Sequence, residues 1–440
     1  MEIQDFLTQA AHVVPDANQL SMLRDNPFYM FVHFGTNTFT DLEWGDGTAS
    51  PDVFNPKNLD CEQWCKAAIS AGMKGIVLTA KHHDGFCLWQ TKYTEYSMKN
   101  SPYKNGQGDI VRECSDACKK FGLKFGFYLS PWDRNSPYYG TDEYNTYYKN
   151  QLTELLTNYG DIFYVWFDGA CGEGPNGKKQ VYDFDGYVEL IKKYQPGAAV
   201  FHDSGSIRWC GNEAGKAPHA MWAVVPSELC KMPAIQTSAG PLSGSLEFMY
   251  NSDTDIGTMP NILYSKGLVF APAEVDMSIR DGWFWHENEN PHSLERLFNT
   301  YISSVGNNST FNLNVPPDRN GRIDERDMVR LRELGDKIRN SFGNCISDDA
   351  KIETSYPYGP SQPVITLSLP EKRHISFVEI AENIRTGQRV ESFTIICDGQ
   401  VSSTTIGSKK IIQLDKFSDK LVLRVNAARA VPEIEYVKLF

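Results

Sequence analysis

The sequence lacks several features that would place it in common classes of protein. It contains no stretch of about 18 to 20 consecutive apolar residues, which a transmembrane helix requires. Its 43 Lys and Arg residues are outnumbered by 55 Asp and Glu residues, which gives a net charge of −12. Proteins that bind nucleic acids through phosphate contacts carry basic surfaces instead. We therefore expect neither membrane insertion nor a nucleic-acid partner.

Motifs for nucleotides and metals are also missing. No GxGxxG follows the first predicted strand, no GxxxxGK[ST] occurs, and no CxxC or zinc-knuckle spacing links the ten cysteines. Cys61 and Cys65, like Cys114 and Cys118, are four residues apart on apolar helix faces, as small buried hydrophobic residues are. We expect mostly reduced structural thiols, and no motif indicates binding of a dinucleotide or of a nucleotide phosphate.

The first fifteen residues have neither the basic segment nor the apolar segment of a secretory leader. The expected location is periplasmic or secreted if a leader has been trimmed, and cytoplasmic otherwise. No feature of the sequence predicts an oligomeric state.

The 440 residues are enough for a large barrel with an added module. From residue 27 to about 205, short β-rich segments alternate with helical patterns, which is typical of βαβ units around a parallel sheet. The predicted strands are 27–35, 74–83, 124–130, 161–169 and 198–203, and the predicted helices between them are 60–72, 109–122, 142–159 and 182–194.

Beyond residue 205 the alternation is less regular, and a sixth strand has no clear position. Apolar runs occur at 246–250 and 268–276, helical periodicity returns at 294–305, and another helix is predicted at about 324–339. We predict an α/β fold, a TIM-like (β/α) barrel that is irregular in its second half and occupies residues 1–345.

The last part of the chain has a different pattern. Alternating apolar and polar segments, separated by turn residues, occur at 363–369, 375–384, 391–399, 404–414 and 420–427. This pattern predicts an all-β domain, an antiparallel β-sandwich, at residues 346–440.

Polar and aromatic side chains occur at or just beyond the carboxyl ends of five successive predicted strands of the barrel. Active sites of such barrels lie where the strands end, so these residues are the first candidates for function. They are His33, then His82, His83 and Asp84, then Tyr128 and Trp132, then Asp168, then His202 and Asp203.

Asp168 is the strongest candidate for a catalytic residue. It directly follows the apolar FYVWF and precedes a glycine, so its carboxylate projects from the end of a strand. Such a carboxylate suits nucleophilic attack at an anomeric carbon, and glycoside hydrolysis needs a second carboxyl group as acid and base. The candidates for this second group are Glu173, Asp203, Glu213 and Glu274.

Glu213 lies between Gly211 and Gly215 and close to Trp209, where apolar surroundings would raise its pKa toward the working range of an acid. The alternative is an ordinary solvated loop glutamate.

The adjacent His82 and His83 admit a metal-dependent hydrolase as an alternative. However, neighbouring side chains on a strand point to opposite faces, and no HxH or HExxH motif accompanies them. Neutral imidazoles that bind sugar hydroxyls explain the pair with fewer assumptions.

Six sequence blocks together resemble glycoside hydrolase family 29, the α-L-fucosidases, over about residues 26–320. They are FVHFG (31–35), EWG (43–45), GIVLTAKHHDGF (75–86), FGFYLSPWD (125–133), VWFDG (165–169) and PAEVDMSIRDGWFWH (272–286).

The resemblance implies a retaining exo-enzyme in which Asp168 is the nucleophile and Glu213 the acid/base. GNEAG around Glu213 is similar to the subfamily that prefers α-1,3- and α-1,4-linked fucose, so the implied partner is a fucosylated oligosaccharide or glycan. The implied substrate-binding residues are His33, Glu43, Trp44, His82, His83, Tyr128, Trp132 and Trp285. Family members of this type need neither a metal nor an organic cofactor. A second alternative is an inactive sugar-binding homologue, against which the presence of both carboxylates argues.

Overall fold

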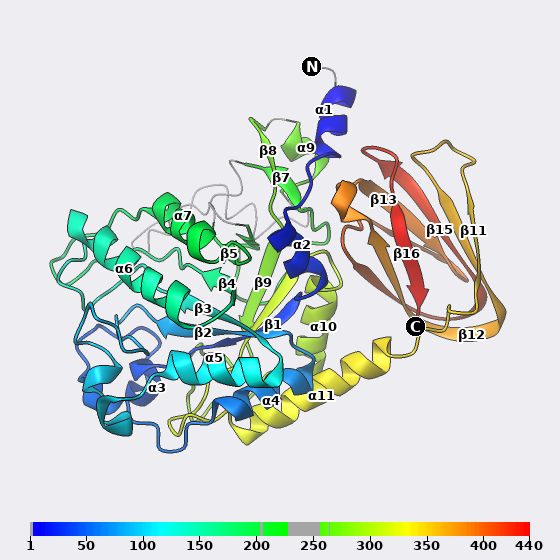
Figure 1. Ribbon diagram of the computed structural model, residues 1–440. Helices are drawn as coiled ribbons and strands as arrows, with labels where there is room; N and C mark the ends of the chain where they lie inside the picture. The colour runs from blue at the N-terminus through cyan, green and yellow to red at the C-terminus, as the bar shows by residue number, and fades with distance from the viewer. Residues whose placement is uncertain (1–2, 203–205, 228–255, 264) are drawn as a thin grey trace.

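The structure is a computed structural model that describes residues 3–202, 206–227, 256–263 and 265–440. An α/β barrel and an antiparallel β domain lie side by side, joined by a long helix (Figure 1). Within the described ranges, no helix combines the length and the apolar character needed to cross a bilayer.

Eight parallel strands form the barrel sheet in the order β5-β4-β3-β2-β1-β10-β9-β6. A parallel bridge from Phe201 at the end of β5 to Ile207, just before β6, brings the two edges together. The predicted (β/α) barrel is therefore confirmed and is nearly closed. The bounds are β1 Phe28–Val32, β2 Gly75–Lys81, β3 Lys124–Leu129, β4 Ile162–Trp166, β5 Ala199–Phe201, β6 Arg208–Trp209, β9 Ala273–Ser278 and β10 Thr310–Asn314.

Helices such as α4, α5 and α10 pack on the outer face of this sheet (Figure 1). Local sequence explains their ends: Asp60 accepts a hydrogen bond from the Gln63 N–H at the start of α4, and Gly72 ends that helix at a φ of 86°. Cys61 and Cys65 of α4 and Cys114 and Cys118 of α5 are buried and unpaired, as expected. The bounds are α1 Ile3–Ala10, α2 Ala17–Arg24, α3 Thr36–Thr40, α4 Cys61–Ala71, α5 Ile110–Phe121, α6 Asp142–Asn158, α7 Phe184–Tyr194, α10 Leu294–Ser304 and α11 Glu325–Phe342.

The second half of the barrel is irregular for a simple reason. Its sixth strand, β6, has only two residues, which pair with Ala273 and Glu274 of β9. The predicted run 268–276 divides into a short strand and most of β9, whereas the run 246–250 lies outside the described residues. The remaining short elements are β7 Val224–Pro226, β8 Leu268–Phe270 and α9 Met259–Ile262, of which β7 and β8 pair antiparallel.

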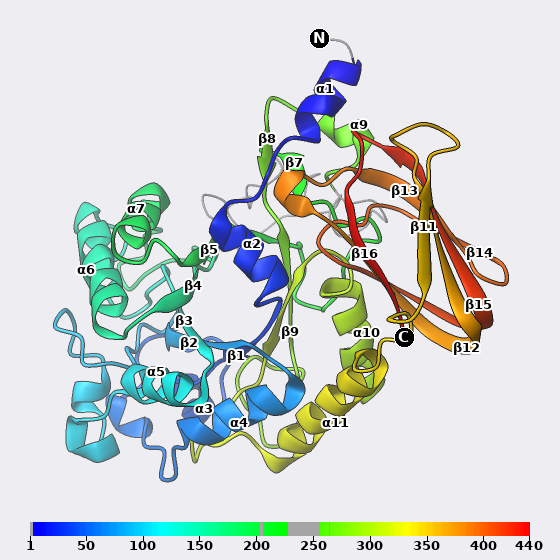
Figure 2. The same ribbon diagram turned by 45° about the vertical axis from the view of Figure 1, so that its right-hand side comes forward.

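The C-terminal domain is built on two long strands, β12 and β15, which pair antiparallel and shift register after Ser368. Leu367 and Ile380, from the two halves of β12, belong to one buried core, so the sheet folds over itself as a sandwich (Figure 2). The bounds are β11 Lys351–Ser355, β12 Val364–Glu382, β13 Val390–Ile396, β14 Gln400–Ser403, β15 Lys410–Ala428 and β16 Ile434–Leu439.

The barrel and the sandwich are joined by aromatic packing and by polar contacts. Phe342, the last residue of α11, packs with ring centroids 5.2 Å from Phe377 and 5.5 Å from Phe440. On another side, Arg24 of α2 forms two hydrogen bonds of 2.6 and 2.7 Å with Glu435 of β16. The sandwich is therefore fixed against the barrel at separate places.

Candidate active site

A cavity of about 130 Å³ opens at the carboxyl ends of the barrel strands. Most of the residues predicted from strand ends meet there, as barrel geometry requires. The predicted residues that line it are His33, Glu43, Trp44, His82, His83, Tyr128, Asp168 and Glu213.

Asp168, two residues beyond β4, is held in one orientation on the cavity wall. One carboxylate oxygen accepts a 2.7 Å hydrogen bond from the Ala170 N–H, and the other accepts a 3.0 Å bond from the Tyr128 hydroxyl. The same oxygen lies 3.6 Å from Nε2 of His83, and 24% of the Asp168 side chain remains exposed. A fixed carboxylate that a ligand can reach suits a nucleophile.

Three imidazoles line the cavity in their neutral form. Burial lowers the pKa of His33 to about 3 and the pKa of His82 well below its ordinary value. Burial also lowers the pKa of His83. Nδ1 of His33 donates to Asn314 Oδ1 at 2.9 Å, which leaves Nε2 to accept a hydrogen bond from a ligand. Neutral imidazoles with a free ring nitrogen suit hydroxyl groups.

Both His82 and His83 line the cavity, although neighbouring strand residues point to opposite faces. The reason is that β2 ends at Lys81, so the two histidines lie beyond the strand. Their ring centroids are 4.2 Å apart. In the described part of the chain, no three His, Cys, Asp or Glu side chains gather as a metal site.

Glu213 reaches the cavity from the loop of residues 210–216, hereafter the Glu213 loop. Oδ1 of Asn212 closes this loop by accepting from the N–H groups of Ala214 and Lys216. The N–H of Gly215 donates to the carbonyl of Asp276 on β9 at 3.1 Å. A short loop after β6 thus presents the carboxylate to the cavity that Asp168 lines from the end of β4.

The surroundings of Glu213 favour its protonated form. Although Glu213 is exposed to solvent, the protein around its carboxylate partly desolvates it and raises its pKa, and the negative charge of Asp168 raises it further. The indole N–H of Trp283 donates to Oε2 at 3.1 Å and opposes the shift. Two carboxyl groups of one cavity therefore differ in environment, as an acid and a nucleophile require.

Two further carboxyl groups lie on β9. Asp276 is buried, lines the cavity and accepts a 3.0 Å hydrogen bond from the indole of Trp209. Burial and the charge of Glu213 raise the pKa of Asp276 well above its usual range.

Glu274, a candidate acid from the sequence, points into the barrel interior and does not line the cavity. Its carboxylate accepts from four side chains, which hold it as a structural group. The donors are Tyr29, Tyr164, Trp166 and Asn312.

The other sequence candidates lie elsewhere. Glu173 is exposed outside the cavity lining, and Asp203 lies outside the described residues. His202 is buried with its ring centroid 3.7 Å from that of Phe184, also away from the cavity.

The structure places Trp283, not Trp285, along the cavity. The carboxylate of Glu43 accepts hydrogen bonds from the backbone N–H groups of Trp283 and Phe284, at 2.8 and 3.1 Å, which aims Trp283 at Glu213. The ring of Trp285 is instead buried and lies 6.0 Å from the guanidinium of Arg280. The resemblance implied a substrate-binding role for Trp285. In the structure Trp285 lies outside the cavity lining, because Glu43 holds the backbone of this loop so that Trp283 lines the cavity instead.

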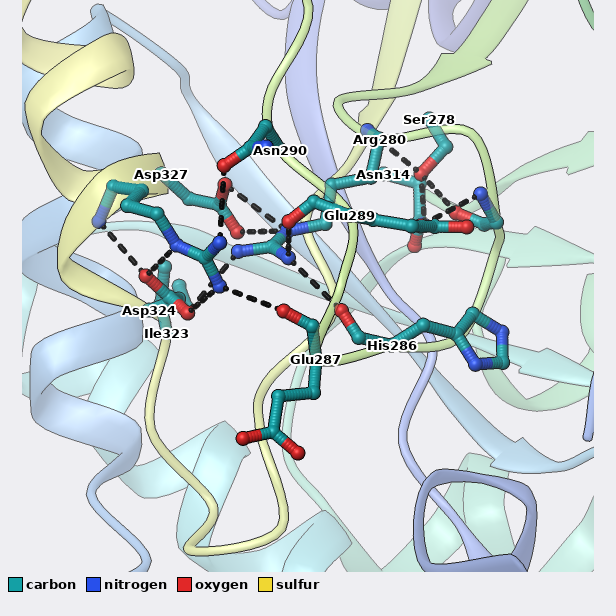
Figure 3. A network of polar contacts seen from close by, with 12 residues as sticks. Ser278, Arg280, His286, Glu287, Glu289, Asn290, Asn314, Ile323, Asp324 and Asp327 are labelled. Atoms are coloured by element: carbon teal, nitrogen blue, oxygen red, sulfur yellow. Dashed lines mark hydrogen bonds and ion pairs between the residues drawn. The ribbon is translucent and has the colours of Figure 1, made fainter. Parts of the chain in front are cut away.

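Arg280 fixes the loop that contains Trp283 (Figure 3). Its buried guanidinium pairs with Asp327 of α11 at 2.8 Å and donates to the carbonyls of His286 and Glu289 at 3.2 and 2.7 Å. His286 in turn donates to Glu43 at 2.7 Å. The loop is thus anchored to the helix layer on one side and to the cavity on the other.

Trp132 does not line the cavity either. Its ring packs behind it, with centroids 5.0 Å from His83 and 5.6 Å from Trp44. Trp132 therefore supports the residues that line the site. Trp44, in contrast, lines the cavity itself and is half exposed.

Sequence patterns alone do not single out several lining residues. Polar residues at alternate positions 274, 276 and 278 of β9 are the one signal that points to Asp276, because such residues share one face of a strand. The other lining residues not predicted are Phe31, Trp166, Ala170 and Trp283.

Comparisons with known proteins found a matching family model and several similar proteins. A family model described as alpha-L-fucosidase matches residues 15–340. Alpha-L-fucosidase 1 of Arabidopsis thaliana is 40% identical over 448 residues, which cover 93% of this chain and 84% of the plant protein.

Solved structures are similar over nearly the whole chain. A Bacteroides ovatus protein superposes with a TM-score of 0.90 at 40% identity, covering 100% of this chain and 76% of that one. A Ruminococcus gnavus family 29 fucosidase, solved in complex with fucose, superposes with a TM-score of 0.83 at 29% identity, covering 98% of this chain and 95% of that one.

Proposed function

Since this chain belongs to the α-L-fucosidase family, glycoside hydrolase family 29, and is an α-L-fucosidase, we propose that it removes terminal α-1,3- and α-1,4-linked L-fucose with retention of configuration. Asp168 acts as the nucleophile and Glu213 as the acid/base. The observation that supports these roles is one cavity with a fixed, accessible carboxylate and a second carboxyl group of raised pKa.

In the first step, Asp168 attacks the anomeric carbon while Glu213 gives its proton to the leaving oxygen, which forms a covalent fucosyl-enzyme. In the second step, Glu213 takes a proton from water, and the resulting hydroxide attacks the anomeric carbon and releases Asp168. This mechanism needs the two carboxyl groups to be about 5 to 5.5 Å apart in the closed site.

The remaining cavity residues bind and orient the sugar. His33, His82 and His83 are neutral and present ring nitrogens to hydroxyl groups, while Tyr128 holds Asp168 by its hydroxyl. The half-exposed ring of Trp44 at the cavity supplies a flat apolar surface for the rest of the oligosaccharide.

The nucleophile is tested by Asp168→Asn. We expect kcat/KM on an aryl fucoside to fall by several orders of magnitude, with an unchanged circular dichroism spectrum. Wild-type turnover by this variant would refute the role of Asp168.

The acid/base is tested by Glu213→Ala. Sodium azide should restore turnover of an aryl fucoside and yield fucosyl azide, because azide attacks the fucosyl-enzyme without a general base. A loss of activity that azide does not restore would contradict the role of Glu213.

The linkage is tested by fucose release from 2′-fucosyllactose, 3-fucosyllactose, Lewis a and Lewis x. Turnover of the last three but not of 2′-fucosyllactose is expected. Exhaustive chelation in the same assay addresses the metal-dependent alternative built on His82 and His83, since a metal-dependent hydrolase would lose its activity.

A further inference from the structure

The segment of residues 218–223, hereafter the anchored segment, follows the Glu213 loop after a single residue, Ala217. It forms neither a helix nor a strand, yet residues 220–223 are buried. Buried carbonyls without a secondary-structure partner need other donors.

Side chains of the C-terminal sandwich hydrogen-bond to the backbone of this segment. Nζ of Lys410 donates to the carbonyl of His219 at 3.0 Å, and the hydroxyl of Thr404 donates to the same oxygen at 3.2 Å. The amide of Gln388, fully buried, donates to the carbonyl of Met221 at 3.3 Å and accepts from the Ala223 N–H at 2.8 Å. Gln388 therefore holds this backbone as a neighbouring strand would.

Two barrel residues connect the same network. Asn307 donates to the carbonyl of Pro218 at 2.8 Å and accepts from Lys410 at 2.6 Å. Asn308 donates to the carbonyl of Met221 at 3.0 Å and accepts from the Ser408 N–H at 2.7 Å. The anchored segment is thus held between the barrel and the sandwich.

The anchored segment is also packed against the Glu213 loop. Met221 and Cys210, the first residue of that loop, share an apolar cluster with Ala273 and Val275 of β9, and Ala217 packs against it. A shift of Met221 would therefore displace the loop at the end where it leaves the barrel.

Burying the ammonium group of Lys410 would be energetically unfavourable if the only role of this residue were to hold the two domains together. Its ammonium group is buried, and within the described ranges no carboxylate lies at ion-pair distance from it. Burying a charge without a counter-charge is unfavourable, and an apolar side chain would join the domains at lower cost. The backbone carbonyl of His219 is the feature that a lysine, but not an apolar residue, can hold.

We propose that the C-terminal sandwich positions the general acid of the barrel, with Lys410, Thr404 and Gln388 as positioning residues that act through the anchored segment on Glu213. This inference rests on the proposed role of Glu213 as acid/base. A misplacement of about 1 Å in a catalytic group can lower a rate by about 100-fold.

The test compares substrates that differ in their need for an acid. A fucosylated trisaccharide needs a proton on its leaving oxygen, whereas 2,4-dinitrophenyl fucoside does not. For Lys410→Met we expect kcat/KM on the trisaccharide to fall about 10- to 100-fold and kcat/KM on the dinitrophenyl substrate to fall less than about threefold. Lys410→Arg, which retains a donor, should recover most of the loss.

Two further variants make the result decisive. Thr404→Val removes one hydrogen bond from a partly exposed site, so it should fold normally and show the same selectivity at about threefold. The matched control is Glu435→Gln, which weakens the contact between β16 and α2 and should leave both substrates unaffected. Equal losses on both substrates, or no loss with either Lys410→Met or Thr404→Val, would overturn the inference.

Glu213→Ala is measured in parallel to separate the two hypotheses. If this variant spares the dinitrophenyl substrate and Lys410→Met does not, only the positioning role fails. If Glu213→Ala itself shows no dependence on the leaving group, the acid/base assignment fails.

Discussion

Asp168 and Glu213 are chemically similar carboxylic acids whose neighbours give them different properties. Asp168 accepts two hydrogen bonds, from Ala170 and Tyr128, which keep a carboxylate in place. Glu213 accepts one, from Trp283, while desolvation and the charge of Asp168 raise its pKa. The two carboxyl groups thus differ in the number of hydrogen bonds that they accept. They also differ because desolvation and a nearby negative charge raise the pKa of Glu213.

Removing the donor from Glu213 should move the pH profile. The N–H of Trp283 stabilises the charged form of Glu213, so Trp283→Phe should raise the pKa of Glu213 further. A general acid works in its protonated form, so the alkaline limb of kcat/KM on an oligosaccharide should shift to higher pH, by about half a unit. The measurement is the pH dependence of kcat/KM from pH 4 to 9.

Trp285→Phe is the control for this shift. It makes the same change two residues away, on a ring that does not line the cavity. Its alkaline limb should coincide with that of the wild type. A shift of equal size in both variants, or a shift of Trp283→Phe to lower pH, would contradict the role of the indole N–H.

At the scale of helices and strands, sequence patterns are informative where local chemistry and packing agree. The helix α5 has an Asp cap at its start, a glycine at its end and a 3.6-residue apolar period, and it forms within one residue of the predicted bounds. The strand β6 has only two residues, which are too few for a periodic sequence pattern. It forms because its backbone pairs with β9 and because the preceding residue, Ile207, bridges to Phe201 at the end of β5. Its position therefore depends on tertiary contacts, which a local sequence pattern does not predict.

The same distinction applies to the candidate site. His33 and Asp168 follow directly from strand ends, because the barrel places every strand end at one rim. Trp283 does not follow, since the direction of its ring depends on Glu43, which is 240 residues away in the sequence. Residues aimed by long-range contacts are therefore the part of the site that a sequence cannot place.

The loop of residues 281–290 depends on Arg280, and this dependence can be separated from simple stability. Arg280→Met leaves Asp327 buried without its partner, which should lower the free energy of unfolding by about 3–5 kcal/mol. It also releases the carbonyls of His286 and Glu289, so Trp283 should lose its alignment and kcat/KM should fall. Denaturant unfolding and kinetics on an oligosaccharide measure the two effects.

Arg280→Lys distinguishes the two roles. A lysine retains the charge near Asp327 but cannot also reach both carbonyls from a planar fork. We expect most of the stability to return while kcat/KM stays low. Recovery of both properties together would mean that the ion pair alone matters.

At the scale of the whole molecule, the two domains behave as one structural unit. Phe377 and Ile411 of the sandwich belong to the main core of the barrel, together with residues of α10 and β10. The polar network around residues 218–223 adds a second connection, close to the active site. The interface therefore has an apolar part that contributes stability and a polar part that contacts the segment next to Glu213.

Removing residues 346–440 should remove the apolar and the polar contacts of the domain interface together. The rings of Phe298 and Phe342 would lose the partner ring of Phe377, and the buried carbonyl of Met221 in the anchored segment would lose its donor Gln388. We expect the truncated barrel to aggregate, since a large exposed apolar patch promotes association. A soluble truncated barrel that cleaves a trisaccharide at the wild-type rate would show that the sandwich is dispensable for both stability and acid catalysis.

In the full chain, Phe377→Ala isolates the apolar part. Phe377 is 8% exposed, so the change should lower the free energy of unfolding by about 3 kcal/mol or more, measured by denaturant titration. Because Phe377 belongs to the main core of the barrel and Met221 of the anchored segment to a separate apolar cluster, the ratio of kcat/KM between trisaccharide and dinitrophenyl fucoside should stay at its wild-type value. For Lys410→Met we expect the opposite pattern, a changed ratio with a smaller loss of stability. Together the two variants would distinguish the contacts that stabilise the domain interface from the contacts that position Glu213. If Phe377→Ala changed the ratio as much as Lys410→Met does, docking of the sandwich as a whole, rather than its contacts to residues 218–223, would set the position of Glu213.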